Sequence, residues 1–469
     1  MENLSAWQKK ISAQQKQTIM SLVERFNRPC PRYTSYPTAK QFVAIEQGDE
    51  IIDEPELYSQ VDRKVNCLSL YFHIPFCQQL CYYCGCHKFI TQNKDKAETY
   101  LNYLIQEVEL RAKNCPEHVK VTDIHLGGGT PTFLTDAQLE RLFDAIKANF
   151  SIADGCEWAI EIDPRTVDSA RIKNIINIGF NRFSLGIQDF NDKTQIAINR
   201  QQSYQSIESI VLAIRQCQTL ETDFSVNFDL IYGLPLQNQQ SFMQTLENVV
   251  SLNPDRIAMF NYAHMPKMFP AQAKIKQADL PNAQLKVAIL IDAINYLEQN
   301  GYRQVGLDHF VKVEDNLYQA LQNETLTRNF QGYADCETQV MLGFGVSAIS
   351  DFSTAMLQNE KQLKAYYQSI DKQQMPFKKV IFRTQQDKQR EGLIHHLLCH
   401  LEIPVNKLDY LTFTSEWLAL KQLETLGLLT INKQQIKVTM VGQIFIRNIA
   451  QIFDSYNKLS HVTGFSNAI

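Results

Sequence analysis

The chain of 469 residues lacks the features that would place it in several simple classes. Its formal net charge is only −4, so no strong basic field favours nucleic-acid binding. No apolar run approaches the roughly 18 residues of a membrane span, and residues 1–26 lack the apolar core of a signal peptide. Internal repeats and low-complexity tracts are also missing. With 44% hydrophobic and 20% charged residues, the chain is expected to be a globular enzyme of the reducing cytoplasm, without a nucleic-acid or membrane partner.

Cysteine, in contrast, is concentrated in one place. Four of the eleven cysteines form the pattern Cys77-x3-Cys81-x2-Cys84-x-Cys86, directly after a strand-like apolar run over residues 68–74. Thiolates are the soft ligands that hold the irons of iron–sulfur clusters. Three thiolates would leave one iron without a protein ligand, and that iron can bind the amino and carboxylate groups of S-adenosylmethionine, a source of radicals. The spacing therefore predicts a cluster site with an open iron.

Zinc and disulfides are the alternatives for these cysteines. A structural zinc site usually has two Cys-x2-Cys hooks separated by a longer stretch, and only Cys81 and Cys84 form one. His73 and His87 could still complete a zinc tetrahedron. A disulfide framework is disfavoured because the other cysteines are scattered along a chain without secretory features.

Strand and helix patterns alternate from residue 68 to about residue 280. Strands are predicted over 68–74, 121–126, 157–162, 182–187, 224–231 and 256–260, and helices over 94–112, 136–150, 168–178, 193–198, 206–216 and 240–250. Six strand–helix units imply a parallel sheet with crossover helices. Because six units are too few for a closed eightfold barrel, we predict an α/β fold with an open, partial (βα)6 barrel. Its active site should lie at the carboxyl ends of the strands.

Beyond about Pro281 the alternation stops. Helices are predicted over 282–299 and 361–373, on either side of a glycine-rich patch at 343–350. From residue 383 the pattern predicts two helices, short strands at 428–431 and 436–439, and a helix over 442–454. This helix-rich, winged-helix-like piece has mixed charges, which favours a lid or docking module over DNA binding. The expected domains are an N-terminal arm (1–60), the partial barrel (61–280), a barrel extension with connecting helices (281–378) and the C-terminal domain (379–469).

Polar residues gather where the predicted strands end. The segment Gly127–Thr130 lets the backbone approach a ligand closely and is a plausible seat for the amino group of a methionine moiety. Glu161 and Asp163 share one face of the third strand, where a carboxylate can accept hydrogen bonds from ribose hydroxyls. For Asp163 a structural salt bridge to Arg165 or Arg182 is the alternative.

Further polar groups follow the fourth, fifth and sixth strands, at residues 184–189, 227–235 and 261–266. His264 in the last of these is expected to be a packing residue. His395, His396 and His400 share a predicted helix, but no acidic partner follows their pattern. We therefore expect that helix to be structural.

Together these segments resemble the family of oxygen-independent coproporphyrinogen III oxidases, which are radical S-adenosylmethionine enzymes. The resemblance runs essentially end to end. Its motifs are Asn-Arg-Pro-Cys-Pro-Arg-Tyr-Thr-Ser-Tyr-Pro-Thr (27–38), Tyr71-x-His73-Ile-Pro75-Phe76, the Cys-Gly-Cys ending at Cys86, Asp-Leu-Ile-Tyr-Gly-Leu-Pro, Phe-Asn-Tyr-Ala-His, and Gly-Val-Ser-Ala-Ile-Ser around Ile349. The chain departs from the family pattern at Tyr83, where phenylalanine is usual, and at Cys30, where a small residue is usual.

The resemblance implies a role for each matching position. Cys77, Cys81 and Cys84 would ligate a [4Fe–4S] cluster, while Cys86 is needed without being an obvious iron ligand. Contacts to the cluster-bound S-adenosylmethionine are implied for Tyr71, Glu161 and Ile349. Contacts to a second S-adenosylmethionine are implied for Tyr83, Gly128, Gly129, Thr130, Gln188, Arg200, Asp229 and Ala263. Tyr71, Cys86 and Glu161 are the residues expected to take part in catalysis.

The implied reaction is the conversion of two propionates of coproporphyrinogen III to the vinyl groups of protoporphyrinogen IX. A 5′-deoxyadenosyl radical takes a hydrogen atom from the β-carbon of the propionate, and carbon dioxide and one electron then leave. The implied partners are a flavodoxin-like electron donor and an electron acceptor that stays open, and the implied state is a monomer. As a hypothesis, Arg28 and Arg32 bind substrate carboxylates. The alternative is a surface arm with solvated arginines.

Three other functions remain as rivals. A haem-binding chaperone has a similar fold, but such relatives typically lack the Cys-Gly-Cys ending and the segment around Arg32 that this chain has. A radical enzyme acting on another tetrapyrrole would transfer a methyl group to haem instead of releasing carbon dioxide. A non-enzymatic regulator would use the winged-helix-like tail to bind DNA.

Overall fold

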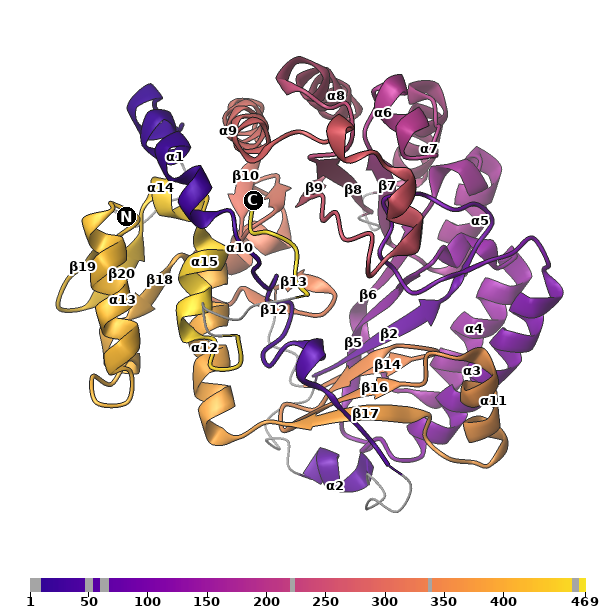
Figure 1. Ribbon diagram of the computed structural model, residues 1–469. Helices are drawn as coiled ribbons and strands as arrows, with labels where there is room; N and C mark the ends of the chain where they lie inside the picture. Colours follow the sequence, from indigo (N-terminus) through magenta and orange to yellow (C-terminus); the bar gives the residue numbers. More distant parts are fainter. Residues whose placement is uncertain (1–9, 47–53, 60–66, 220–223, 336–339, 458–463) are drawn as a thin grey trace.

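A 13-stranded sheet forms the centre of the molecule in the computed structural model, which describes residues 10–46, 54–59, 67–219, 224–335, 340–457 and 464–469 (Figure 1). In spatial order its strands are β1 (Val43–Ala44), β17 (Phe377–Phe382), β16 (Ala355–Asn359), β15 (Ile349–Asp351), β14 (Val340–Phe344), β2 (Cys67–Ile74), β5 (Lys120–Gly128), β6 (Ile152–Ile162), β7 (Arg182–Gln188), β8 (Ser225–Tyr232), β9 (Arg256–Asn261), β11 (His309–Val311) and β10 (Arg303–Val305). The sheet curves but does not close, since β1 and β10 are its two ends.

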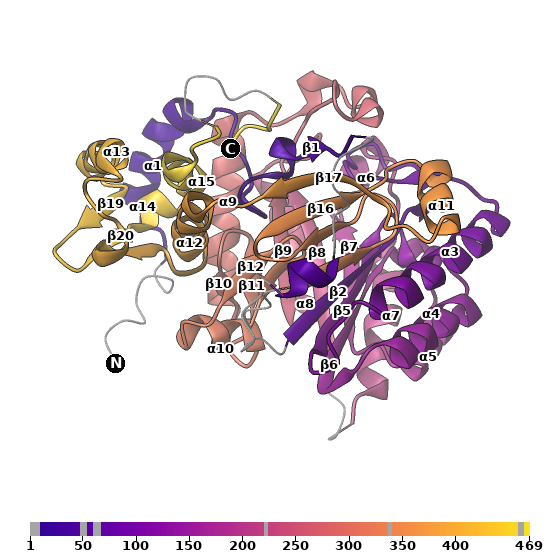
Figure 2. The same cartoon turned by 90° about the horizontal axis from the view of Figure 1, so that it is seen from below.

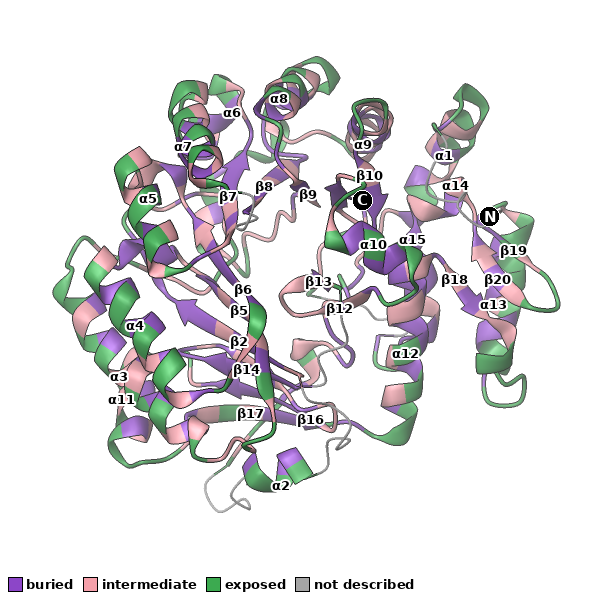
Figure 3. Ribbon diagram, turned by 180° about the vertical axis from the view of Figure 1, so that it is seen from behind, coloured by how far each residue is buried: buried purple, intermediate pink, exposed green. Residues whose placement is uncertain are grey.

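The middle of the sheet is parallel, from β14 through β2, β5, β6, β7 and β8 to β9. The six strands predicted from the sequence are all present, and the partial barrel is confirmed. Helices cover its outer face (Figures 1 and 2). They are α3 (Asp95–Ala112), α4 (Asp136–Asn149), α5 (Ser169–Ile178), α6 (Asp192–Ala197), α7 (Tyr204–Cys217), α8 (Gln239–Leu252) and α9 (Ala283–Gln299). Their exposed residues lie on the side away from the sheet, and the strands are mostly buried (Figure 3). No helix among the described residues has the length and apolar character needed to cross a membrane.

The chain after Pro281 returns to the sheet as strands β14 to β17, whereas only helices and a glycine-rich patch were predicted for the barrel extension. Strand β14 pairs in parallel with β2, so that Gly343 lies opposite Tyr71. The glycine-rich patch is the turn between β14 and β15, and Gly345 adopts a φ of 90° there. All five residues of β14 are buried. A short, fully buried run has no alternation of polar and apolar residues, and so its sequence does not distinguish a strand from other buried segments.

A buried polar network attaches α3 to this turn. The Glu107 carboxylate accepts hydrogen bonds from Gly345 N at 2.7 Å, Asn359 Nδ2 at 2.9 Å and Tyr366 Oη at 2.6 Å. One turn later, the Arg111 guanidinium pairs with Glu54 and donates to the Gly343 carbonyl and to Ser350 Oγ. Because an unpaired buried charge is costly and both charged members are paired here, this network holds β14 and β15 beside β2; Asn359 Oδ1 is the atom of it without a partner among the described residues. Ile349, at the start of β15, is thereby placed near the parallel strands.

The N-terminal arm lies across several parts of the molecule. Helix α1 (Ala13–Phe26) begins with a capping box formed by Ser12 and Gln15 and packs against α9 and α14 (Met440–Gln443) (Figure 1). Strand β1 then pairs with β17. The segment between α1 and β1 crosses the C-terminal part of the chain, where the Tyr33 hydroxyl donates to Asp454 Oδ2 at 3.0 Å. Other elements of the first 380 residues are α2 (Glu54–Ser59), α10 (Asn316–Gln322), α11 (Leu363–Asp371) and the hairpin of β12 (Thr327–Asn329) and β13 (Gly332–Ala334).

The C-terminal region forms a module beside the β10 end of the sheet (Figure 1). It contains α12 (Gln385–His400), α13 (Thr414–Thr425) and a three-stranded sheet of β18 (Glu402–Pro404), β20 (Gln435–Val438) and β19 (Leu429–Ile431). The helix predicted over 442–454 was wrong as a single helix. It is broken into α14, α15 (Ile446–Ala450) and the 3-10 helix Gln451–Phe453. The break lies at Phe445, which leaves helical geometry with a φ of −109° and a ψ of 18° and donates to the Gly442 carbonyl three residues back.

Candidate active site

The cysteine loop begins where β2 ends, at the carboxyl edge of the parallel strands. A short parallel pair, β3 (Phe76–Cys77) with β4 (Phe89–Ile90), closes the base of the loop. Cys77 and Cys81 are buried, Cys84 is half-buried and Cys86 is exposed. The loop is therefore fixed at its ends and carries its thiols toward the interior edge of the barrel, where the sequence places the site.

The histidines near the loop are already engaged. His73 Nδ1 is 3.1 Å from the Tyr71 hydroxyl, and His73 Nε2 is 2.9 Å from the His87 carbonyl oxygen. His87 Nε2 is 2.9 Å from the Lys361 carbonyl oxygen. In the part of the chain that the structure describes, no three His, Cys, Asp or Glu side chains converge as ligands of one metal ion do. These contacts argue against the zinc alternative, whereas the thiolates of a cubane each bind a different iron and need not converge.

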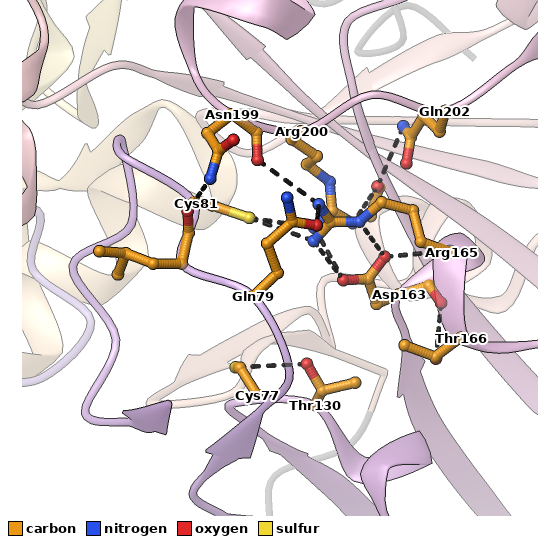
Figure 4. A network of polar contacts seen from close by, with 12 residues as sticks. Cys77, Gln79, Cys81, Thr130, Asp163, Arg165, Thr166, Asn199, Arg200 and Gln202 are labelled. Carbon is orange, nitrogen blue, oxygen red and sulfur yellow. Dashed lines mark hydrogen bonds and ion pairs between the residues drawn. The ribbon is translucent and has the colours of Figure 1, made fainter. Parts of the chain in front are cut away.

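Two guanidinium groups point at the thiol of Cys81 (Figure 4). Arg165 Nη2 lies 3.3 Å and Arg200 Nη1 lies 3.6 Å from Cys81 Sγ. The Asp163 carboxylate joins the two arginines, with contacts of 2.7 Å to Arg165 Nη2 and 3.1 Å to Arg200 Nη1. Burial acts to raise the pKa of Asp163, but Arg200 and Arg165 outweigh it and hold the pKa at about 2. The Asp163 carboxylate is thus ionised, and it orients two cationic donors toward a sulfur atom.

The other thiols of the loop also accept hydrogen bonds. The Thr130 hydroxyl donates to Cys77 Sγ at 3.3 Å (Figure 4), although burial still raises the pKa of the Cys77 thiol to about 11. The Cys86 N–H donates to Cys84 Sγ at 3.4 Å. Hydrogen bonding from Cys86 lowers the pKa of Cys84 to about 6, and the same contact raises the pKa of Cys86. Lys88, which donates to the carbonyl oxygens of Cys84 and Cys86, further favours the Cys84 thiolate.

This donor set fits an iron–sulfur cluster held by three thiolates. Cys77, Cys81 and Cys84 each have a hydrogen-bond donor on sulfur, as thiolates bound to iron commonly do. Cys86 has no donor on its sulfur among the contacts of the described residues. The exposed Cys86 thiol is therefore distinguished from the other three by its surroundings as well as by its position.

A second group of predicted residues meets at the ends of β2, β5 and β6. The Glu161 carboxylate lies 3.2 Å from His125 Nε2 and accepts a hydrogen bond from Gly128 N at 3.1 Å. The His125 ring stacks on Tyr71 at 5.9 Å between centroids. Burial acts to raise the Glu161 pKa, but the contacts with His125 and Gly128 lower it. A carboxylate and a phenol are thus held side by side at the edge of the barrel.

The glycines next to Glu161 are required by this close packing. A Cβ on Gly127 would lie 2.7 Å from Glu161 Oε1, and one on Gly128 would lie 2.6 Å from the His73 ring. Gly128 also has a φ of 111°, which other residues rarely adopt. On Gly129, a Cβ would meet the backbone of Pro75 and Phe76. Ile349 completes the group, since its backbone packs on Gly343 opposite Tyr71.

The residues predicted for a second ligand form a neighbouring group. Arg200 Nη2 donates to the Gly186 carbonyl at 2.6 Å, and the Gln188 amide approaches the same glycine, with a φ of 67° at Gln188. The Gln272 amide bridges the carbonyl oxygens of Tyr83 and Ala263, at 2.8 and 3.1 Å. A short loop after β9 therefore packs on the cysteine loop.

Asp229 lies on the inner face of β8. Its carboxylate accepts hydrogen bonds from Ser184 Oγ and Asn227 Nδ2, both at 2.9 Å. Burial and the nearby Glu161 raise the Asp229 pKa to about 6. The structure brings Asp229 and Glu161 within electrostatic reach of each other, as expected for residues that share one edge of a parallel sheet.

Some contacts could not be predicted. Of the two salt bridges considered for Asp163, the one with Arg165 is present, whereas Arg182 pairs with Glu157 at 2.5 Å. The role of His125 was missed, although a histidine on the inner face of a predicted strand was a signal that could have found it. The predicted structural helix with His395, His396 and His400 is α12, and burial lowers the pKa values of His395 and His396 to about 4.

Comparisons with known proteins agree with this geometry. A family model described as the radical SAM superfamily matches residues 71–249, which include the cysteine loop. The oxygen-independent coproporphyrinogen III oxidase of Salmonella typhimurium is 40% identical over 467 residues, or 98% of this chain and 100% of that protein. The protein of the same name from Synechocystis sp. is 40% identical and covers 96% of this chain and 97% of its own length. The structure of coproporphyrinogen III oxidase from Escherichia coli, described as a radical SAM enzyme, superimposes with a TM-score of 0.85 at 40% identity, covering 91% of this chain and 97% of that one.

Proposed function

Because the chain belongs to the family of oxygen-independent coproporphyrinogen III oxidases, we propose that it oxidatively decarboxylates coproporphyrinogen III to protoporphyrinogen IX in haem biosynthesis. The observation that carries the proposal is 40% identity over 98% of the chain, with the cysteine loop at the carboxyl edge of the partial barrel. In each of two rounds a propionate loses a hydrogen atom from its β-carbon, carbon dioxide and one electron, and becomes a vinyl group. Oxygen takes no part.

Membership in the radical SAM superfamily implies a [4Fe–4S] cluster and S-adenosylmethionine. When bound, they supply an electron and the 5′-deoxyadenosyl radical that takes the hydrogen atom from the propionate. Cys77, Cys81 and Cys84 are the residues that would hold the cluster. The donors Thr130 and Arg165 stabilise negative charge on the first two of these sulfurs.

The group around Glu161 binds the S-adenosylmethionine at the open iron in this proposal. The Glu161 carboxylate, ionised and fixed by His125, is an acceptor for ligand hydroxyl or ammonium groups. Tyr71 and the backbone of Ile349 line the same edge. Fixing these groups before the ligand arrives reduces the entropic cost of orienting the 5′-carbon toward the substrate.

A second S-adenosylmethionine belongs to the proposal as well. Its contacts are assigned to Tyr83, Gly128, Gly129, Thr130, Gln188, Arg200, Asp229 and Ala263. The pairing of Arg200 with Asp163 and the bridging of Tyr83 and Ala263 by Gln272 support a preformed pocket there. Equilibrium dialysis of the reconstituted protein should then give two bound ligands per chain, and a single bound ligand would remove this part of the proposal.

The remaining assignments concern partners and Cys86. An acceptor must take one electron per vinyl group, and a flavodoxin-like protein is proposed as the electron donor to the cluster. We further propose that the chain acts as a monomer in the cytoplasm. Cys86, with its exposed thiol beside the loop, is assigned a part in catalysis separate from iron binding.

The test is turnover by the anaerobically reconstituted protein with coproporphyrinogen III, S-adenosylmethionine and a reductant. Protoporphyrinogen IX should appear together with methionine and 5′-deoxyadenosine. Cys84→Ser should lose cluster iron and all three products, whereas Cys217→Ser, a half-buried cysteine at the end of α7, should keep them. Cleavage of S-adenosylmethionine without a vinyl product would indicate that the substrate is another tetrapyrrole. An intact cluster with neither reaction would favour a haem-binding chaperone.

A further inference from the structure

Four cationic side chains from distant parts of the sequence gather at the ends of β8 and β9. Arg32 comes from the N-terminal arm, Lys286 from the first turn of α9, Arg328 from β12 and Arg447 from α15. Arg447 and Arg328 lie close enough to Arg32 to lower its pKa, and Arg32 and Arg447 do the same to Lys286. We name these four residues the cationic group.

Arg32 and Lys286 are fixed to the carboxyl ends of the strands. Arg32 Nη2 donates to the Asn261 carbonyl at 2.6 Å, and Asn261 is the last residue of β9. Lys286 Nζ lies 3.5 Å from the Tyr262 carbonyl. A Cβ on Gly233, which follows β8, would lie 3.0 Å from Lys286 Cε. Both cations therefore lie at the same edge of the sheet as Asp229, which is on β8.

The charges of the group are poorly compensated. Among the residues that the structure describes, no carboxylate is within 4.0 Å of Arg32, Lys286 or Arg447. Arg328 approaches Asp308, but only at 3.9 Å, and Asp308 is also paired with His309 at 2.8 Å. Four cations thus share one carboxylate. Gathering like charges away from bulk water is unfavourable unless a ligand or partner offsets them.

Arg328, the buried arginine of the group, has N–H donors without an acceptor. The Arg328 side chain is 5% exposed, and its Nε and Nη1 atoms make no hydrogen bond. The guanidinium instead packs on the Tyr333 ring at 4.6 Å. Buried guanidinium donors are nearly always paired in folded proteins, and so an unpaired pair of donors indicates a place for an acceptor.

Solvent reaches the group although protein surrounds it. The Arg32 side chain is exposed, yet burial lowers its pKa to about 10, with Arg447 adding to the effect. Burial, Arg32 and Arg447 lower the pKa of Lys286 to about 8. Of the four cations, Lys286 alone also lines a cavity of about 440 Å³ between α1, α9 and the C-terminal segment, with Glu24 on its α1 side. Such a setting suits a bound anion, which would restore the charged forms.

Arg447 holds the group together and uses four of its five N–H donors on backbone carbonyls. Its Nε donates to the Pro31 carbonyl at 3.1 Å, and its Nη2 donates to the Cys30 carbonyl. Its Nη1 donates to the carbonyls of Asn467 and Ala468, at 3.3 and 3.1 Å. We therefore regard Arg447 as a positioning residue that ties the backbone just before Arg32 to the C-terminal segment.

We propose that Arg32, Lys286 and Arg328 form a carboxylate subsite that binds a propionate of the tetrapyrrole, an inference that rests on the proposed function. A guanidinium matches the planar carboxylate with two parallel hydrogen bonds, and the lysine adds a point charge. The subsite selects a polycarboxylate and fixes the ring so that another propionate faces the radical. Arg28 is not part of it, because the cation beside it is Arg25 and its guanidinium packs on Phe26.

Binding of coproporphyrin III, the stable oxidised tetracarboxylate, tests the subsite separately from turnover. The full-length protein should bind it, and the tetramethyl ester of the same porphyrin should bind at least about tenfold more weakly. Lys286→Gln and Arg32→Gln should each raise the dissociation constant about tenfold or more, the effect of losing one charge-assisted hydrogen bond. Lys286→Arg should restore most of the affinity. Lys276→Gln, which removes an exposed lysine outside the group, is the matched control and should match the wild type.

Two further measurements separate the possible failures. Cluster absorbance and S-adenosylmethionine binding should be unchanged in Lys286→Gln, because neither ligand is assigned to this subsite. The inference is overturned if the wild-type protein binds the acid and the ester equally, if Lys286→Gln and Lys276→Gln behave alike, or if the affinity lost is that for S-adenosylmethionine. The protein could bind the porphyrin acid more tightly than its ester, lose affinity in Lys286→Gln, and still fail to decarboxylate coproporphyrinogen III. That result would support the subsite and refute the proposed function.

Discussion

Replacing Asp163 by asparagine removes the one carboxylate that joins Arg165 and Arg200 beside Cys81. The pKa of Asp163 is lowered from 3.8 to about 2, a shift of nearly two units. At 1.36 kcal/mol per unit, the ionised Asp163 stabilises the folded chain by about 2.5 kcal/mol at neutral pH. The side chain is only 11% exposed, so solvent screens little of this. The two guanidinium groups left without a counter-charge add to the loss.

We therefore expect Asp163→Asn to lower the free energy of unfolding of the apoprotein by about 2.5 to 4 kcal/mol at pH 7. Urea denaturation followed by circular dichroism measures it, with Glu140→Gln on the exposed face of α4 as the control, expected within about 0.5 kcal/mol of wild type. Because the folded pKa is depressed, the contribution is complete above pH 3.8 and is lost only as pH falls toward 2. The difference should thus be the same at pH 7 and pH 5.

Either of two results would refute this reasoning. One is an Asp163→Asn protein as stable as Glu140→Gln at pH 7, which would mean that the arginines find other partners at no cost. The other is a difference that disappears between pH 7 and pH 5, which would assign the effect to a group with a higher pKa than Asp163.

Three other substitutions test the remaining parts of the site and its support. Gly128→Ala should destabilise the protein by about 1 to 3 kcal/mol, because φ at this position is 111° and the new Cβ would meet the His73 ring. Thermal denaturation measures the loss, and an unchanged melting temperature would contradict the close approach. Glu161→Gln keeps the shape of the side chain but removes its charge, and should weaken S-adenosylmethionine binding about tenfold in equilibrium dialysis; equal affinity would exclude a charged contact. Tyr366→Phe leaves the buried Glu107 without its 2.6 Å donor and should cost about 1 to 3 kcal/mol in urea denaturation. A smaller loss than that from an exposed Tyr→Phe change would show that Glu107 is protonated or otherwise paired.

The parallel part of the fold could be predicted because its signals are local. Each of the six predicted strands is a segment of five to eight residues rich in apolar side chains. Each is followed by a helix whose apolar residues recur at helical spacing, and the crossover rule then orders them. Strand β14 carries no such signal, since all five of its residues are buried and no crossover helix precedes it in an alternating series. The helix predicted over 442–454 failed for a related reason, because apolar spacing continues across Ile444 and Phe445, where the helix is interrupted.

In the candidate site, too, the features set by neighbouring residues could be predicted and the contacts between distant residues could not. The spacing of Cys77, Cys81 and Cys84 in one loop was enough to predict cluster chemistry, because the ligands are neighbours in sequence. That Cys81 faces two guanidinium groups was not predictable, since Arg200 is 119 residues away from it. The cysteine loop, two strands and a helix must pack together before Arg200 can contact Cys81.

By itself, the sequence determined which cysteines share one loop, the order of the parallel strands and the edge at which their polar ends meet, since each depends on residues close together in the chain. Only the tertiary structure decided which charges face one another. It paired Asp163 with Arg165 and not with Arg182, and it brought Arg32 and Arg447, more than 400 residues apart, to one cationic group. The physical reason is that a local pattern reports which face of an element is buried, whereas the partner on that face is selected by the packing of the whole chain.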